Sequence, residues 1–221
     1  VAATARAPRF DLSYHTGEGK LLYLSVAEGY GSGGTAATVL NGCQSPEQYG
    51  PDHLWSYEIG AKAALLDGRM QVDASVFHLR WNNAVSACGD SSIAGVAATN
   101  QASDGLDFAA RALLTEHVRA GLNIAYTDAH YTKTTKLDDV VVVHEGDAID
   151  GPINVISPWN ITGSIEYSLH SDTVHLRAED VFHSHNPGPY HWDDPASLYY
   201  APGFRTDAAT NVINLRADVS W

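Results

Sequence analysis

The sequence predicts an all-β fold built as an antiparallel meander of long strands. Apolar and polar residues alternate with period two in segment after segment, whereas helical periodicity is scarce. Most of these segments are about 11 to 13 residues long, and the connections between them are alternately short and long. With 44% hydrophobic residues, 10% aromatic residues and 19 glycines, the composition excludes a disordered or collagen-like chain.

Nine segments carry the alternation. The clearest is 159–169, where Trp159, Ile161 and Ile165 share one face while Asn160 and Thr162 share the other. The predicted strands, in chain order, are 9–15, 20–28, 55–65, 69–81, 101–113, 118–130, 159–169, 173–183 and 211–221. Because nine is an odd number, either a further strand lies in a long loop, near Ser197 to Tyr200, or the sheet is open.

One strand breaks its own pattern. In 69–81 the apolar positions run through Met70 and Val76 and then change phase at Phe77 and Trp81. This change predicts either a β-bulge or an aromatic girdle.

Strand and loop lengths favour a membrane barrel. Strands of globular proteins centre on about five or six residues, whereas a tilted strand needs about 9–11 to cross a bilayer. The short connections are 16–19, 66–68, 114–117 and 170–172, and the long ones are 29–54, 82–100, 131–158 and 184–210. All long loops therefore fall at one end of the meander, as in outer-membrane barrels.

The charges of the strands follow the same geometry. Seven ionisable residues fall on polar strand faces, where a wet lumen would solvate them: Glu58, Lys62, Asp73, Arg177, Glu179, Arg216 and Asp218. The sequence therefore predicts part of a transmembrane β-barrel with apolar faces toward lipid. The alternative is a soluble β-sandwich or lipocalin-like barrel with the apolar faces inward.

The overall charge limits the partners. There are 13 Lys+Arg against 26 Asp+Glu, a formal net charge of −13, and the basic residues do not cluster along the sequence. Nucleic acid is therefore not expected as a partner. The first residues, 1–9, lack the features of a signal peptide, so an exported protein would need a leader outside this sequence.

Several strand-flanking stretches resemble TonB-dependent outer-membrane receptors. They are Arg9-Phe10-Asp11-Leu12-Ser13-Tyr14, the run Leu22 to Tyr30 followed by Gly33-Gly34, and Pro51 to Lys62. The family's Asn-Ala-Gly run is altered here, at Asn100 to Asp107. Residues 1–221 correspond to a single portion of barrel from the C-terminal half of such a receptor, without the plug and the last strands.

The resemblance implies a location and a function. The chain would lie in the bacterial outer membrane, in contact with lipid, and would help to bind and import a scarce nutrient such as an iron–siderophore complex. Its small-molecule partner would be a metal chelate, and no cofactor is required beyond such a bound metal or iron chelate. An energy-coupling protein would act only through the missing N-terminal part of the receptor.

The two cysteines lie in neighbouring long loops. Cys43 is in the first long loop and Cys88 in the second, so both are expected on the extracellular side. A disulfide between them suits an exported protein, and the resemblance supports the same pairing. Two unrelated free thiols are the alternative.

The last long loop carries the densest set of polar and aromatic residues. We expect ligand contacts from His183, His185, Tyr190, His191 and Trp192. Three of the imidazoles, with Asp193, are also weak candidates for a transition-metal site. No catalytic residue is assigned, because no motif of nucleophilic or metal-dependent catalysis is present.

Two alternative functions remain open. One is a metal-dependent hydrolase in which the loop His/Asp cluster activates water. The other is an independent small β-barrel binding module. An acidic set in the third long loop, Asp138, Asp139, Glu145, Asp147 and Asp150, is expected to be solvated, with weak calcium binding as the sharper option.

Overall fold

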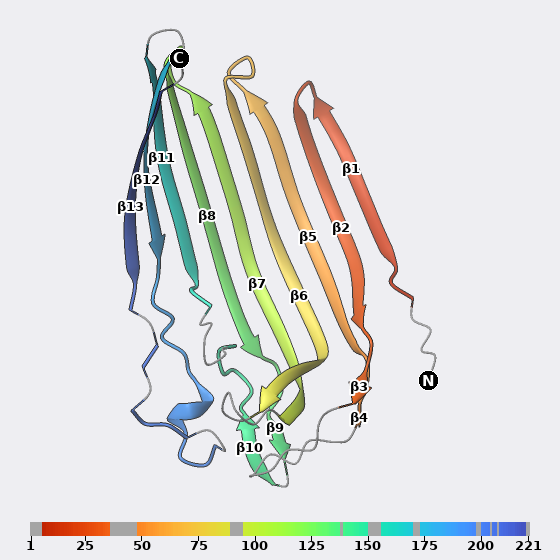
Figure 1. Cartoon of the computed structure of the whole chain (residues 1–221). Coiled ribbons are helices and arrows are strands. Elements are labelled where there is room, and N and C mark those ends of the chain that lie inside the picture. The colour runs from red at the N-terminus through yellow and green to blue at the C-terminus, as the bar shows by residue number, and fades with distance from the viewer. Residues whose placement is uncertain are drawn as a thin grey trace.

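The computed structural model describes residues 6–35, 48–88, 95–137, 139–149, 156–169, 173–197, 200–203, 205–206 and 208–219. Its main element is a nine-stranded sheet with the order β1-β2-β5-β6-β7-β8-β11-β12-β13, in which every neighbouring pair is antiparallel (Figure 1). The nine strands are β1 (Arg9–Gly17), β2 (Lys20–Gly31), β5 (Asp52–Leu65), β6 (Met70–Cys88), β7 (Gly95–Leu113), β8 (Val118–Tyr131), β11 (Trp159–Leu169), β12 (Val174–His183) and β13 (Thr210–Val219). The all-β meander and all nine predicted strands are thereby confirmed.

Short turns meet at one end of the sheet and long loops at the other, which we call the short-turn end and the long-loop end (top and bottom of Figure 1). The long loops hold two small strand pairs and one short helix: β3 (Gly34–Thr35), β4 (Gln48–Tyr49), β9 (Thr135–Leu137), β10 (Val140–Val143) and η1 (His191–Asp193). Around Ser197 the described residues form only a single parallel bridge, to Val141. No helix among the described residues is long and apolar enough to cross a membrane.

The strand register separates a polar face from an apolar one. On the polar face Lys62 is paired with Asp73, and Arg177 lies between Glu166 and Arg216. We call this the lumen face, because charged side chains at this density need water.

The opposite, outward face is apolar and uncovered. Ile59, Ile165 and Leu215 are 57%, 50% and 80% exposed. Near the long-loop end Trp159 packs against Tyr126 with ring centroids 4.7 Å apart, as expected of aromatic residues at a membrane interface. No second layer among the described residues covers this face, so the sandwich and lipocalin-like alternatives are wrong. The exposed apolar band is explained by contact with lipid.

Strand β6 does not bulge where the sequence pattern changes phase. Its register with β7 is continuous from Met70 to Trp81 and shifts only before Ala84, next to Asn83, whose φ is 58°. Phe77 therefore points to the lumen face, opposite Gly105, where an added Cβ would collide with the Phe77 ring. An irregularity of the kind predicted does exist, but it follows Trp81, and the Phe77 ring faces the lumen. Neither a bulge nor an outward-facing aromatic girdle therefore explains the change of phase at Phe77. A glycine on the neighbouring strand makes room for an inward aromatic ring instead.

The buried apolar residues lie at the long-loop end. One cluster joins Tyr131 to Val142 and Val143 of β10. At the long-loop end, where β11 begins with Trp159, the segment 146–149 lies beside β8 in the position that β11 has further along the sheet. There the Tyr131 N–H donates to the Asp147 carbonyl over 2.9 Å. Residues 146–149 of the third loop and Pro189 of the fourth thus continue the strand order beyond the long-loop end of the sheet.

Candidate functional site

The predicted ligand residues of the fourth long loop fall into two environments. His183 and His185 are exposed. His183 ends β12 on the lumen face, and its Nδ1 is hydrogen-bonded to the Asn160 side chain of β11. His185 Nδ1 lies 3.2 Å from Thr206 Oγ1. Both imidazoles are therefore oriented by a polar neighbour while remaining accessible at the mouth of the lumen.

Tyr190 and Trp192 lie inside the loops rather than on their surface. They are only 5% and 7% exposed, and they form a buried cluster with Ala148 of the third loop. Their rings stack with centroids 4.4 Å apart and an angle of 13° between the planes. Tyr190 also donates its hydroxyl to the Asn186 carbonyl over 2.9 Å. In this structure these two aromatic residues form part of the packed core that joins the third and fourth loops.

His191 is held neutral by its surroundings. Its ring meets the edge of Trp192, with centroids 5.1 Å apart. Burial lowers the pKa of His191 from 6.5 to about 4, and the nearby Asp193 carboxylate opposes this shift in part. At neutral pH the ring is therefore an uncharged hydrogen-bonding group.

A polar link between the third and fourth loops was missed by sequence reasoning. His144 Nε2 lies 2.5 Å from Asp194 Oδ2, and the Ala196 N–H donates to Asp194 Oδ1 over 2.9 Å. The Ala196 N–H and then His144 lower the pKa of Asp194. Asp147 accepts the His144 N–H over 2.7 Å, and burial raises the pKa of Asp147. His144 and Asp194 are 50 residues apart in sequence, so no local pattern could have paired them.

The structure does not support the predicted metal site, and it does not test the predicted disulfide. In the described part of the chain, to which the candidates His183, His185, His191 and Asp193 belong, no three His, Cys, Asp or Glu residues are grouped so that they could hold a metal ion. Cys43 lies outside the described residues, and Cys88 is the last residue of β6. The disulfide therefore stays a prediction. Asp138 and Asp150 of the acidic set also lie outside the described residues.

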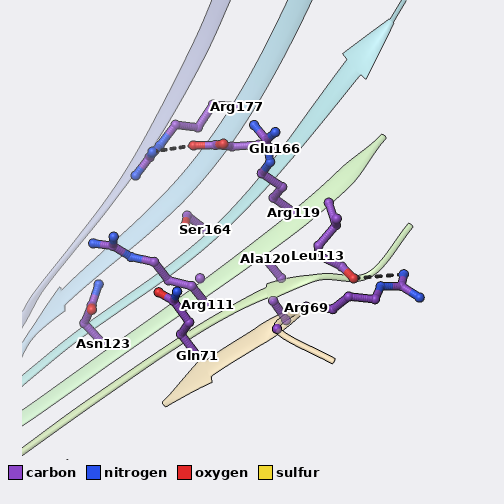
Figure 2. Close-up of a pocket in the computed structure, with 13 residues that line it drawn as sticks. Arg69, Gln71, Arg111, Leu113, Arg119, Ala120, Asn123, Ser164, Glu166 and Arg177 are labelled. Atoms are coloured by element: carbon purple, nitrogen blue, oxygen red, sulfur yellow. Dashed lines mark hydrogen bonds and ion pairs between the residues drawn. The ribbon is translucent and has the colours of Figure 1, made fainter. Parts of the chain in front are cut away.

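A second polar site lies on the lumen face near the short-turn end. It is a hollow of about 450 Å³ across β6, β7, β8, β11 and β12, and Arg111, Arg119 and Ser164 are among the residues that line it (Figure 2). Arg111 and Arg119 carry no local sequence motif that marks them as site residues. The alternation of residues is enough to put both on the polar face, but their presence in one hollow depends on strand register.

Known proteins share this architecture. Residues 3–221 match the model of the protein family described as "TonB dependent receptor-like, beta-barrel". No curated protein matches the sequence.

Solved structures share the fold at low sequence identity. The ferric yersiniabactin uptake receptor FyuA from Yersinia pestis is 10% identical, with a TM-score of 0.67 over 95% of this chain and 29% of that one. BauA, the ferric preacinetobactin receptor from Acinetobacter baumannii, is 15% identical, with a TM-score of 0.64 over 96% and 29%. The ferric-catecholate import receptor Fiu from E. coli K12 is 15% identical, with a TM-score of 0.62 over 95% and 28%.

The chain thus spans less than a third of the length of each of these receptors. The match to the family extends over almost all of its residues, and the lipid-facing band, the polar lumen face and the alternating turns and loops agree with it. The chain therefore belongs to the β-barrel family of the TonB-dependent receptors, which are outer-membrane proteins.

Proposed function

We propose that this chain forms the part of an outer-membrane receptor that captures an iron–siderophore complex at the mouth of its lumen. The similar solved structures are receptors for ferric yersiniabactin, ferric preacinetobactin and ferric catecholates, which supports this ligand class. The observation that carries the proposal is the packed pair of loops at the long-loop end, from which His183 and His185 stay exposed.

The loop core favours binding by preorganisation. Tyr190 and Trp192 stack on each other and pack against Ala148, and the Ala148 N–H donates to the Pro189 carbonyl over 2.7 Å, which fixes one loop against the other. A site whose groups are already ordered loses less conformational entropy when a ligand binds. The two accessible imidazoles can donate hydrogen bonds to the oxygen atoms of a chelate or accept them from its hydroxyl groups.

The partners follow from the two faces of the sheet. The outward face contacts outer-membrane lipid, and the loop end meets the chelate. Coupling to an energy-transducing protein would pass through parts of the receptor outside these 221 residues.

The test uses the full-length receptor that contains this chain, purified in detergent. Quenching of tryptophan fluorescence by a ferric catecholate and by a ferric hydroxamate complex is titrated for the wild type and for the double variant His183→Ala/His185→Ala. We expect one complex to bind, and its Kd to rise about tenfold in the double variant because two polar contacts are lost.

His117→Ala is the matched control, because His117 is also exposed but lies in the turn between β7 and β8 at the short-turn end. Its Kd should equal that of the wild type. Failure of the wild type to bind any ferric siderophore complex would contradict the ligand class. An unchanged Kd in the double variant would contradict the assignment to these two histidines.

A further inference from the structure

The lumen-face hollow near the short-turn end has a composition unlike the rest of the chain. Four arginines line it, out of 13 Lys+Arg in a chain of net charge −13: Arg69, Arg111, Arg119 and Arg177. The acidic residue among its lining residues is Glu166. The hollow is thus a concentrated positive site in an acidic protein.

Strand register and one glycine build the hollow. Gln71 pairs with Arg111, Arg111 pairs with Gly121, and Gly121 pairs with Ser164, so these four positions form one row across the lumen face. A Cβ at Gly121 would lie 2.7 Å from Ser164 Oγ. Because Gly121 has no side chain, the floor of the row stays open between Arg111 and Ser164.

Two of the four guanidinium groups already have partners. Arg177 contacts Glu166 Oε1 at 2.6 Å and Glu179 Oε2 at 2.5 Å. Arg69 donates to the carbonyl oxygens of Leu113 and Leu114 over 3.1 and 3.0 Å. Figure 2 shows the Arg177–Glu166 ion pair on one side of the hollow and the Arg69–Leu113 hydrogen bond on the other.

The other two have no carboxylate partner among the described residues. Arg119 is directly across from Glu166 in the register, but Glu166 is bonded to Arg177, and no ion pair joins it to Arg119. Arg111 lies on the neighbouring strand, two residues further along the register, and extends toward Asn123 (Figure 2). Both side chains are exposed, and their guanidinium groups point to different sides of the hollow (Figure 2). Each can therefore pair with a carboxylate of its own.

We propose that Arg111 and Arg119 each bind a carboxylate group, with Gln71, Asn123 and Ser164 as neutral hydrogen-bonding neighbours. A guanidinium group matches a carboxylate with two parallel hydrogen bonds. The carboxylate can come from a free anionic ligand in the lumen or from an Asp or Glu side chain of the receptor outside these 221 residues. The site is distinct from the loop site and does not depend on which nutrient is imported.

The experiment compares variants of the full-length receptor in detergent. The probe is citrate, whose binding is measured by isothermal titration calorimetry at low ionic strength, and Tm is measured separately without citrate. The test variants are Arg111→Gln/Arg119→Gln and Arg111→Lys/Arg119→Lys. The control is Arg80→Gln, because Arg80 is exposed on the outward face of β6 and has no ion pair among the described residues.

Two results support the site and distinguish its sources. If citrate binds the wild type and the Gln variant weakens it about tenfold or more, the carboxylate belongs to a free ligand. If citrate does not bind but the Gln variant lowers Tm by a few degrees, if the Lys variant restores part of that loss, and if high salt removes the difference, the carboxylate belongs to the receptor itself.

Three results overturn the proposal. The first is absence of citrate binding together with a Tm equal to that of Arg80→Gln. The second is equal citrate binding by the wild type and the Gln variant, which would place citrate elsewhere. The third is a loss of Tm that the Lys variant does not restore, which would mean that the arginines act by packing. If the double variant does not fold, the single variants Arg111→Gln and Arg119→Gln carry the same comparison.

Discussion

At the scale of single residues, burial decides the chemistry of the loop end. Tyr190 and Trp192 have the aromatic side chains that often contact ligands, yet they are 5% and 7% exposed and stack on each other. His191 lies between them in sequence and has a pKa lowered to about 4 by the same burial. The exposed groups are His183 and His185, whose positions at the rim leave them in water.

The lowered pKa of His191 predicts that acid loosens the fourth loop. Between pH 6.5 and about 4 the packed loop binds fewer protons at this residue than an opened loop does, so its stability falls as the pH falls through that window. Hydrogen exchange of residues 186–197, measured by mass spectrometry at several pH values, should show faster opening below pH 6.5 in the wild type than in His191→Gln.

Two neighbouring carboxyl groups do not produce the same effect. The pKa of Asp194 is lowered from 3.8, so its stabilising contribution persists until the pH falls below that value. The pKa of Asp147 is raised, so acid favours the packed form at this residue, opposite in sign to His191. His15→Gln, a change near the turn between β1 and β2, should leave the profile of the wild type intact. Identical profiles for the wild type and His191→Gln would show that His191 is not the responsible group.

At the scale of strands, glycines decide where large side chains fit on the lumen face. Gly60 of β5 is paired with Tyr23 of β2, and a Cβ at Gly60 would lie 2.5 Å from the Tyr23 ring. That ring position lets the Tyr23 hydroxyl donate to Glu58 Oε1 over 2.5 Å. Gly163 of β11 is the contrasting case, because it faces outward and an added Cβ would meet nothing within 4 Å.

These contacts predict opposite tolerances for the same substitution. Gly60→Val should displace the Tyr23 ring, break its hydrogen bond and lower the free energy of unfolding by about 1–3 kcal/mol. Gly163→Val should be neutral or slightly stabilising, because valine suits an open strand position. Urea unfolding of the full-length receptor in detergent measures both. Equal losses for the two variants would show that the Tyr23 contact is unimportant.

At the scale of the whole molecule, the directions of the edge strands limit how the sheet can close. Since all eight neighbouring pairs along the order are antiparallel, the first and ninth strands, β1 and β13, run in the same direction. Every residue of these two strands is exposed. A closed antiparallel barrel therefore needs an odd number of further strands between β13 and β1.

This geometry predicts the behaviour of the 221-residue chain when it is produced alone. It should be rich in β-structure by circular dichroism in detergent, but it should not form the compact barrel that migrates differently on gels before and after heating. Two copies with the same orientation in a membrane could pair their edge strands only in parallel. Self-association would therefore not complete an antiparallel barrel. The full-length receptor is the control and should show the shift on heating. A heat-dependent shift of the isolated chain, as a monomer, would contradict the open sheet.

Sequence alone determined the features that depend on local alternation. The nine strands, their two faces and the alternation of turns and loops follow from a period of two, which each segment expresses within a dozen residues. Local patterns also carried the family resemblance, because its motifs flank the strands. The alternation changes phase at Phe77, whose ring faces the lumen in the space that Gly105 leaves on the neighbouring strand.

Only the tertiary structure decided which residues meet across the chain. His144 contacts Asp194, and Tyr190 and Trp192 pack against Ala148, although these residues are far apart in sequence. Arg111 lies in one row with Gly121 and Ser164, which can be known only from the strand register. Side-chain type limits what each of these residues can do. Whether a residue packs in the core, joins two loops or binds a ligand depends on its neighbours in space, because these neighbours determine its burial and its protonation state.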